Sequence, residues 1–141
     1  MKNRDYLRFG DRDAYFKMTL IVEESNLNAK GDIYVAIDIA SGQFSGKNDL
    51  WIRVKDFTSF CRELNDLNTS LNGEALLQSA SPDELSLRVF AADSRGSITL
   101  EATTGYSKSG AKFGHSVTVG FSVELQQLSE ALSLPWVRKR L

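Results

Sequence analysis

The residues best suited to catalysis gather in one stretch, SKSGAKFGHSVTVGF at 107–121. It contains His115, the only histidine of the chain, together with Gly110, Gly114 and Gly120. A histidine beside serine hydroxyls could act as the base of a nucleophilic hydrolase, and glycines could hold a phosphate against backbone amides. The alternative is a strand of a sheet that happens to carry a histidine.

The surrounding residues favour the strand. A phosphate-binding loop needs glycines at set offsets at the start of a helix, whereas here apolar residues alternate and no helix begins. The SGK at 45–47 lacks the Gly-Lys-Ser/Thr ending of a P-loop, and no nearby serine has a nucleophile-elbow pattern. We therefore expect His115 on an apolar face near the buried edge of a sheet. Gly114 and Gly120 would share the opposite face, where a helix or neighbouring backbone comes close.

Metal chemistry lacks the residues that it needs. Zinc sites draw on several Cys, His and carboxylate groups at definite spacings, but this chain has one cysteine, Cys61, and one histidine, both on apolar stripes. We expect no metal and no cofactor, and we expect Cys61 to be a small buried hydrophobe. Paired carboxylates leave no local signature, so a carboxylate-based hydrolase stays open.

Size and charge narrow the class of protein. A chain of 141 residues is about one domain long, so we expect a single domain over 1–141, with a loosely ordered start at 1–14 and a basic tail at 135–141. Its 17 basic and 18 acidic residues give a net charge of −1, without the excess of Lys and Arg that nucleic acid or an anionic membrane requires. The single cysteine and a start without an apolar run favour the cytoplasm.

The spacing of apolar residues along the chain predicts the strands and helices that would position any functional site. Alternation of apolar and polar residues predicts strands at 15–23, 32–40, 42–54, 84–92, 97–106 and 107–121, with a shorter one at 74–80. Between the two runs of strands, Phe57, Phe60 and Leu64 fall at helical spacing, with Asp56 as the expected N-cap. A second amphipathic helix is expected over 123–134.

This order of elements is typical of an α+β fold. We predict a mostly antiparallel β-sheet meander of about eight strands, with one helix between the two strand runs and one C-terminal helix. The helices would cover one face of the sheet or its end. Tyr34 and Trp51 point away from the apolar faces of their strands. They either pack under a helix or form a partner-binding patch, since Trp and Tyr are favoured interface anchors.

Three stretches carry a family pattern. In FSGKNDLWIRVKDFTSFCRELNDLNTSLNGEALLQS, a strand with an LWI segment leads into a helix with Phe and Leu anchors. ELSLRVFAADSRGSITLEATTGY is a hairpin, and in HSVTVGFSVELQQLSEAL a GF segment leads into the closing helix. Together, over about 15–134, they resemble the WapI-like immunity protein family. The resemblance implies a cytosolic antidote that neutralises a contact-dependent or polymorphic toxin by binding it, without chemistry of its own.

We therefore expect a non-enzymatic protein that binds a protein partner. The candidate partner-binding residues are Tyr34, Asp38, Trp51, Arg53 and Glu101. One alternative is a small-molecule-binding or hydrolytic domain, in which polar groups of the sheet face converge around a pocket. Those groups would be Asp38, Arg53, Arg88 and Glu101. Another alternative is a structural or oligomerisation module built on Tyr34 and Trp51.

Overall fold

The computed structural model describes residues 4–23, 32–81, 83–106 and 114–141, and within them it contains eight strands and three helices. The strands are β1 (Tyr6–Gly10), β2 (Ala14–Glu23), β3 (Ile33–Ser41), β4 (Phe44–Ile52), β5 (Glu74–Gln78), β6 (Leu85–Ala91), β7 (Ile98–Tyr106) and β8 (His115–Val123). The helices are α1 (Val54–Ser70), α2 (Leu125–Ser133) and α3 (Pro135–Arg138). The predicted α+β class, the antiparallel strands and the helix between the two strand runs are confirmed.

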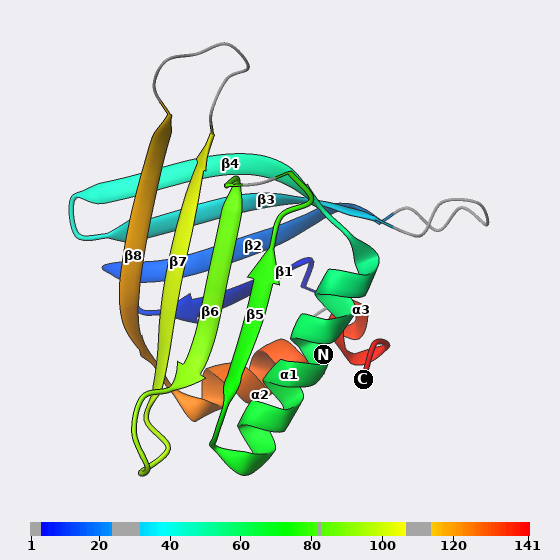
Figure 1. Ribbon diagram of the computed structural model, residues 1–141, viewed down its shortest axis with the longest axis vertical. Helices are drawn as coiled ribbons and strands as arrows, with labels where there is room; N and C mark the ends of the chain where they lie inside the picture. Colours follow the sequence, from blue (N-terminus) through cyan, green and yellow to red (C-terminus); the bar gives the residue numbers. More distant parts are fainter. Residues whose placement is uncertain (1–3, 24–31, 82, 107–113) are drawn as a thin grey trace.

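The strands divide into two antiparallel sheets. The first sheet has the order β1-β2-β3-β4 and the second sheet the order β5-β6-β7-β8, so every hydrogen-bonded neighbour is also a sequence neighbour. Figure 1 shows the second sheet in front of the first, with the strands of the two sheets crossing at a steep angle. Such crossed packing buries one face of each sheet against the other.

The core follows from the alternation of side chains along the strands. Each strand turns every second residue inward, because successive side chains leave a pleated strand on opposite faces. The fully buried side chains of the two inner faces include Phe9, Phe16, Met18, Val35, Ile37, Ile39, Ile52, Leu77, Leu87, Val89 and Leu100. The helices complete this core with Phe57, Phe60, Leu64 and Leu128.

The helices lie at the margins of the two sheets. Helix α1 packs along β5, and α2 packs against β1 and α1, as Figure 1 shows at the lower right. Helix α1 begins at Val54 with Arg53 as its N-cap residue, so the prediction that Asp56 caps it is wrong. Asp56 lies instead in the first turn, where a carboxylate stabilises the positive end of the helix dipole.

The described residues near both ends of the chain pack into the fold. Tyr6–Gly10 forms β1 with Leu7 and Phe9 buried, and Asp11 closes the turn into β2 by accepting backbone hydrogen bonds. At the other end Trp136 is buried, and Arg140 donates a hydrogen bond to Glu23 at 2.8 Å. In the part of the chain described, none of the helices is long and apolar enough to span a bilayer.

Candidate partner-binding surface

The outer face of the first sheet carries an aromatic pair that none of the three described helices covers. Tyr34 of β3 and Trp51 of β4 are direct cross-strand partners, and their ring centroids lie 5.0 Å apart. Trp51 remains 40% exposed because α1 and α2 pack elsewhere, on β5 and β1. Of the two interpretations from the sequence, packing under a helix is therefore wrong for this pair.

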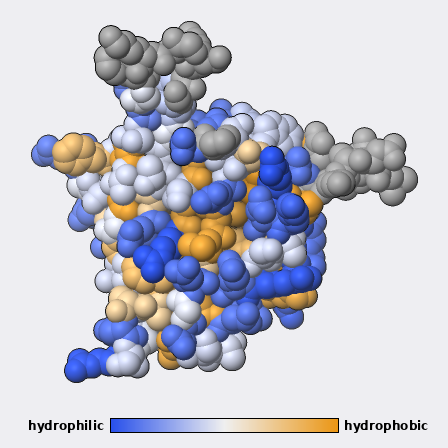
Figure 2. All heavy atoms as spheres, viewed as in Figure 1, coloured by the Kyte–Doolittle hydropathy of each residue, from blue (hydrophilic) through white to orange (hydrophobic). Residues whose placement is uncertain are grey.

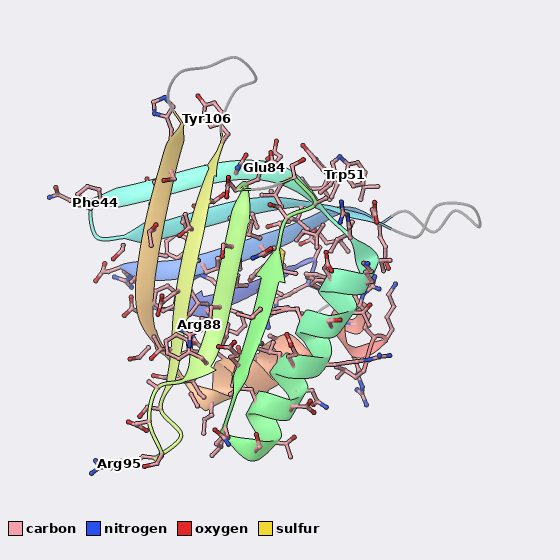
Figure 3. The ribbon with its side chains drawn as sticks, viewed as in Figure 1. Phe44, Trp51, Glu84, Arg88, Arg95 and Tyr106 are labelled. Carbon is pink, nitrogen blue, oxygen red and sulfur yellow. The ribbon has the colours of Figure 1, made fainter. Side chains whose placement is uncertain are left out.

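Two carboxylates flank the aromatic pair. Asp49 and Glu84 lie near the Tyr34 hydroxyl, Glu84 from the loop before β6. Burial raises the pKa of the Tyr34 phenol, and the charges of Asp49 and Glu84 raise that pKa further. The backbone holds this corner together, since the Ala80 N–H donates to the Trp51 carbonyl at 2.8 Å. Figure 3 shows Trp51 and Glu84 at the same upper edge of the molecule.

Asp38 belongs to the same outer face, four residues after Tyr34 along β3. It accepts a hydrogen bond from the Tyr15 hydroxyl at 3.3 Å, and its cross-strand partners are Lys17 and Lys47. The Arg8 guanidinium lies over the Tyr15 ring, 4.7 Å from its centroid. The outer face of the first sheet thus combines aromatic rings, cations and carboxylates in one layer, with Arg53 exposed just beyond its end.

Glu101 and Arg88 lie on the opposite side of the molecule, on the outer face of the second sheet. Arg88 contacts Glu74 at 3.0 Å and Glu101 at 3.7 Å, and its guanidinium lies 3.7 Å from the centre of the Phe90 ring. Figure 3 places Arg88 on β6, well below the edge that carries Trp51. The four groups expected to converge around a pocket, Asp38, Arg53, Arg88 and Glu101, therefore do not all come together: Arg88 and Glu101 are in contact, but Asp38 and Arg53 lie on the other sheet.

His115 lies at the start of β8 and is exposed, which differs from the expected position near a buried edge. The predicted alternation holds along β8, because Val119 and Val123 on the same side of the strand are buried. The first sheet, however, does not extend under the beginning of β8. The imidazole instead faces Tyr106 of β7, with ring centroids 5.7 Å apart. The two rings border a hollow of about 170 Å³ that also contacts Lys47 and Asn48.

The close approach expected at the glycines of β8 is found instead at Gly105 of β7, where an added Cβ would collide with the His115 carbonyl, and at Gly46. Gly120 is exposed, and a side chain there would meet only the Leu100 carbonyl at 3.6 Å and Glu101 at 3.9 Å. Gly46 of β4, in contrast, lies where the two sheets cross, since an added Cβ would come within 3.1 Å of Val117. Gly110 lies outside the described residues.

Cys61 is buried in α1, as the helical spacing predicted. Burial raises the pKa of its thiol to about 12, so the thiolate needed for nucleophilic attack is not formed near neutral pH. Within the described ranges, no three His, Cys, Asp or Glu side chains lie close enough together to hold a metal ion.

Sequence reasoning missed two exposed aromatic residues. Phe44 is 75% exposed at the tip of the β3–β4 hairpin, and Tyr106 is exposed at the end of β7. In Figure 3 both lie, with Trp51, along the upper part of the molecule, and Phe44 projects beyond β8. Phe44 falls on the inward side of its strand, so alternation alone indicates burial and gives no signal of its exposure.

These features define a small α+β domain of two crossed antiparallel sheets, with aromatic side chains exposed on an uncovered sheet face. Over residues 7–133 the sequence matches the immunity protein WapI-like family, and the chain belongs to that family. The family resemblance of the three stretches is thereby confirmed. Neither a curated protein nor a solved structure shows a significant match to the chain.

Proposed function

We propose that this chain is an immunity protein that neutralises a cognate bacterial toxin by binding it directly, in the cytoplasm and without catalysis. The observation that carries the proposal is membership of the WapI-like immunity family over residues 7–133. The buried, protonated thiol of Cys61 and the separation of Asp38 from Glu101 agree with a role in binding.

We further propose that Tyr34, Trp51, Asp38 and Arg53 belong to the toxin-binding surface. Interface hot spots are enriched in Trp and Tyr, because these side chains bury a large area at a small cost in rotamer entropy. The carboxylates of Asp49 and Glu84 beside the Tyr34 ring favour a cation, so a basic side chain of the toxin fits over the aromatic pair. Glu101, on the second sheet, lies too far round the molecule to share this patch.

Co-expression tests the proposed function. The probe is the toxin domain sought in the product of the adjacent upstream gene, expressed in a host with and without this chain. We expect the domain alone to stop growth and the pair to grow normally and to co-purify. A domain that is harmless, or whose toxicity is unchanged by this chain, contradicts the proposal.

Light scattering on this chain alone tests the alternative of an oligomerisation module. A dimer that dissociates on the substitution Trp51→Ala would assign the aromatic pair to self-association.

A further inference from the structure

The two sheets have four outer edges, and two of them are covered. At β1, the Gln127 side chain bonds both backbone groups of Gly10, at 3.3 and 2.6 Å, and the Trp136 indole donates to the Arg4 carbonyl at 3.1 Å. At β5, helix α1 lies alongside, and Glu63 accepts from the Leu76 N–H at 3.0 Å. Covering an edge in this way prevents another strand from pairing with it.

The β4 edge is partly blocked. The Trp51 carbonyl already accepts from Ala80, and the Asn48 side chain accepts from the Asp49 N–H at 3.0 Å. Lys47 lies next to Asn48 on the same strand, and a lysine on an edge strand opposes pairing because its charge would lose water. Among the described residues, only the edge of β8 has neither a covering element nor a charged side chain.

Strand β8 has the composition of a strand that pairs on both sides. Its nine residues, HSVTVGFSV, include no Lys, Arg, Asp, Glu or Pro. The hydrogen-bond pattern between β6, β7 and β8 shows which backbone N–H and C=O groups of β8 point away from the sheet. The Gly105 N–H donates toward β6, to the Glu84 carbonyl at 3.2 Å, so the alternate residues of β7 bond toward β8. Consequently the backbone groups that point away from the sheet are those of Ser116, Thr118, Gly120 and Ser122. Among the described residues none bonds to them.

The first sheet extends past β8, so its inner face has room for one more strand beside β8. Successive inward residues of β4 lie under successive strands of the second sheet. Asn48 lies under β7, where it donates to the Gly105 carbonyl at 2.8 Å, and Gly46 lies under β8, against Val117. The next inward residue is Phe44, and none of the eight described strands lies over it. Two residues of β4 advance about 6.6 Å, enough to pass the spacing of about 4.8 Å between neighbouring strands.

We propose that an extended segment of the protein partner pairs with the free edge of β8 as a ninth strand, with its inward apolar side chains resting on Phe44. This inference rests on the proposed function, since the partner is the toxin. Strand addition of this kind obtains affinity from backbone hydrogen bonds and selectivity from alternate side chains. The half-buried Val117 and Phe121 would be covered at the same time.

The charge of Glu101 favours a basic side chain on the outward face of the added strand. Glu101 is the cross-strand partner of Gly120, and it is largely exposed, with Arg88 at 3.7 Å as its ion-pair contact. Because Gly120 has no side chain, a long basic residue on the added strand can reach across it to Glu101. A second copy of β8 would bring only serine, threonine and glycine to that face, so a partner segment with a Lys or Arg fits better than self-pairing.

Amide hydrogen exchange by NMR tests the inference on the unmodified protein, with an inactivated form of the upstream-encoded toxin domain as the probe. We expect the amides of Ser116, Thr118, Gly120 and Ser122 to exchange at least tenfold more slowly in the complex. If the toxin domain binds and these amides exchange as before, the edge is not used. If the amides are protected in the chain alone at high concentration, together with a dimer by light scattering, the occupant is a second copy and the inference is overturned.

Substitutions test it independently. Thr118→Pro removes the outward N–H and leaves the backbone hydrogen bonds to β7 in place, but it also removes the hydroxyl that bonds Thr103. Thr118→Val is the matched control, because it removes the same hydroxyl and keeps the N–H. We expect binding at least tenfold weaker for the proline variant and unchanged for the valine variant. Phe44→Ser should also weaken binding, whereas Leu76→Ser, on the outer face of the second sheet, should not. Equal binding by all four variants overturns the inference, while failure of the unmodified chain to bind rejects the proposed function as well.

Discussion

Trp51→Ala removes the largest exposed side chain of the outer face of the first sheet. Trp51 is 40% exposed in the free protein. A tryptophan can bury up to about 250 Å², so about 100 Å² of it remains for a partner to cover. At about 25 cal/mol per Å², covering that area contributes about 2.5 kcal/mol, which corresponds to about 70-fold in Kd.

The same substitution has a smaller effect on folding. It removes the contact with the Tyr34 ring at 5.0 Å, and aromatic pairs contribute about 0.5–1.5 kcal/mol beyond their buried area. The hydrogen bond from Ala80 is retained because it uses the backbone carbonyl of residue 51. The variant should therefore fold at room temperature, so that a loss of binding can be separated from a loss of structure.

Isothermal titration calorimetry against the inactivated toxin domain measures the effect on Kd, with urea unfolding as the measure of stability. Leu76→Ala is the control, since Leu76 is 45% exposed, on the other sheet, and of comparable apolar character. We expect a loss of about 70-fold for Trp51→Ala and a change below threefold for Leu76→Ala. A Kd for Trp51→Ala within threefold of the unmodified chain would refute the assignment of the aromatic pair to the interface.

Two further predictions concern the fold itself. Trp136 stacks on Phe57 with centroids 5.6 Å apart, so Trp136→Ala should lower the free energy of unfolding by about 3–5 kcal/mol in urea, whereas exposed Arg138→Ala should leave it nearly unchanged; a loss below 1 kcal/mol for Trp136→Ala would show that α3 adds little to the core. Because burial raises the pKa of the Cys61 thiol from 9.0 to about 12, that thiol should resist a thiol-specific disulfide reagent at pH 8 until the chain unfolds. The unfolded thiol loses its proton first, so stability should fall as the pH rises from about 9 toward 12, more steeply than in Cys61→Ala; equal slopes, or rapid native labelling, would contradict this.

Local sequence patterns predicted the elements well. The 3.6-residue spacing of Phe57, Phe60 and Leu64 located α1, because a helix that buries one stripe must repeat its apolar residues at that period. The helix start was wrong by a few residues, since Asp56 is a good cap by type but the chain turns at Arg53. Of the candidate binding residues, Tyr34 and Trp51 were brought together because a cross-strand register aligned them. Glu101 was placed on the other sheet, which no local pattern could indicate.

The sequence by itself determined which side chains share a face and which family the chain belongs to, because strand alternation and family motifs are local properties of the chain. Only the tertiary structure decided which faces are covered. His115 and Phe44 both point to the inward side of their strands, and both are exposed. The reason is that the two sheets cross, so that each extends past the other and leaves inward positions without a layer above them. Burial of a strand residue depends on where the opposite sheet ends, and that boundary is set by contacts between segments far apart in the sequence.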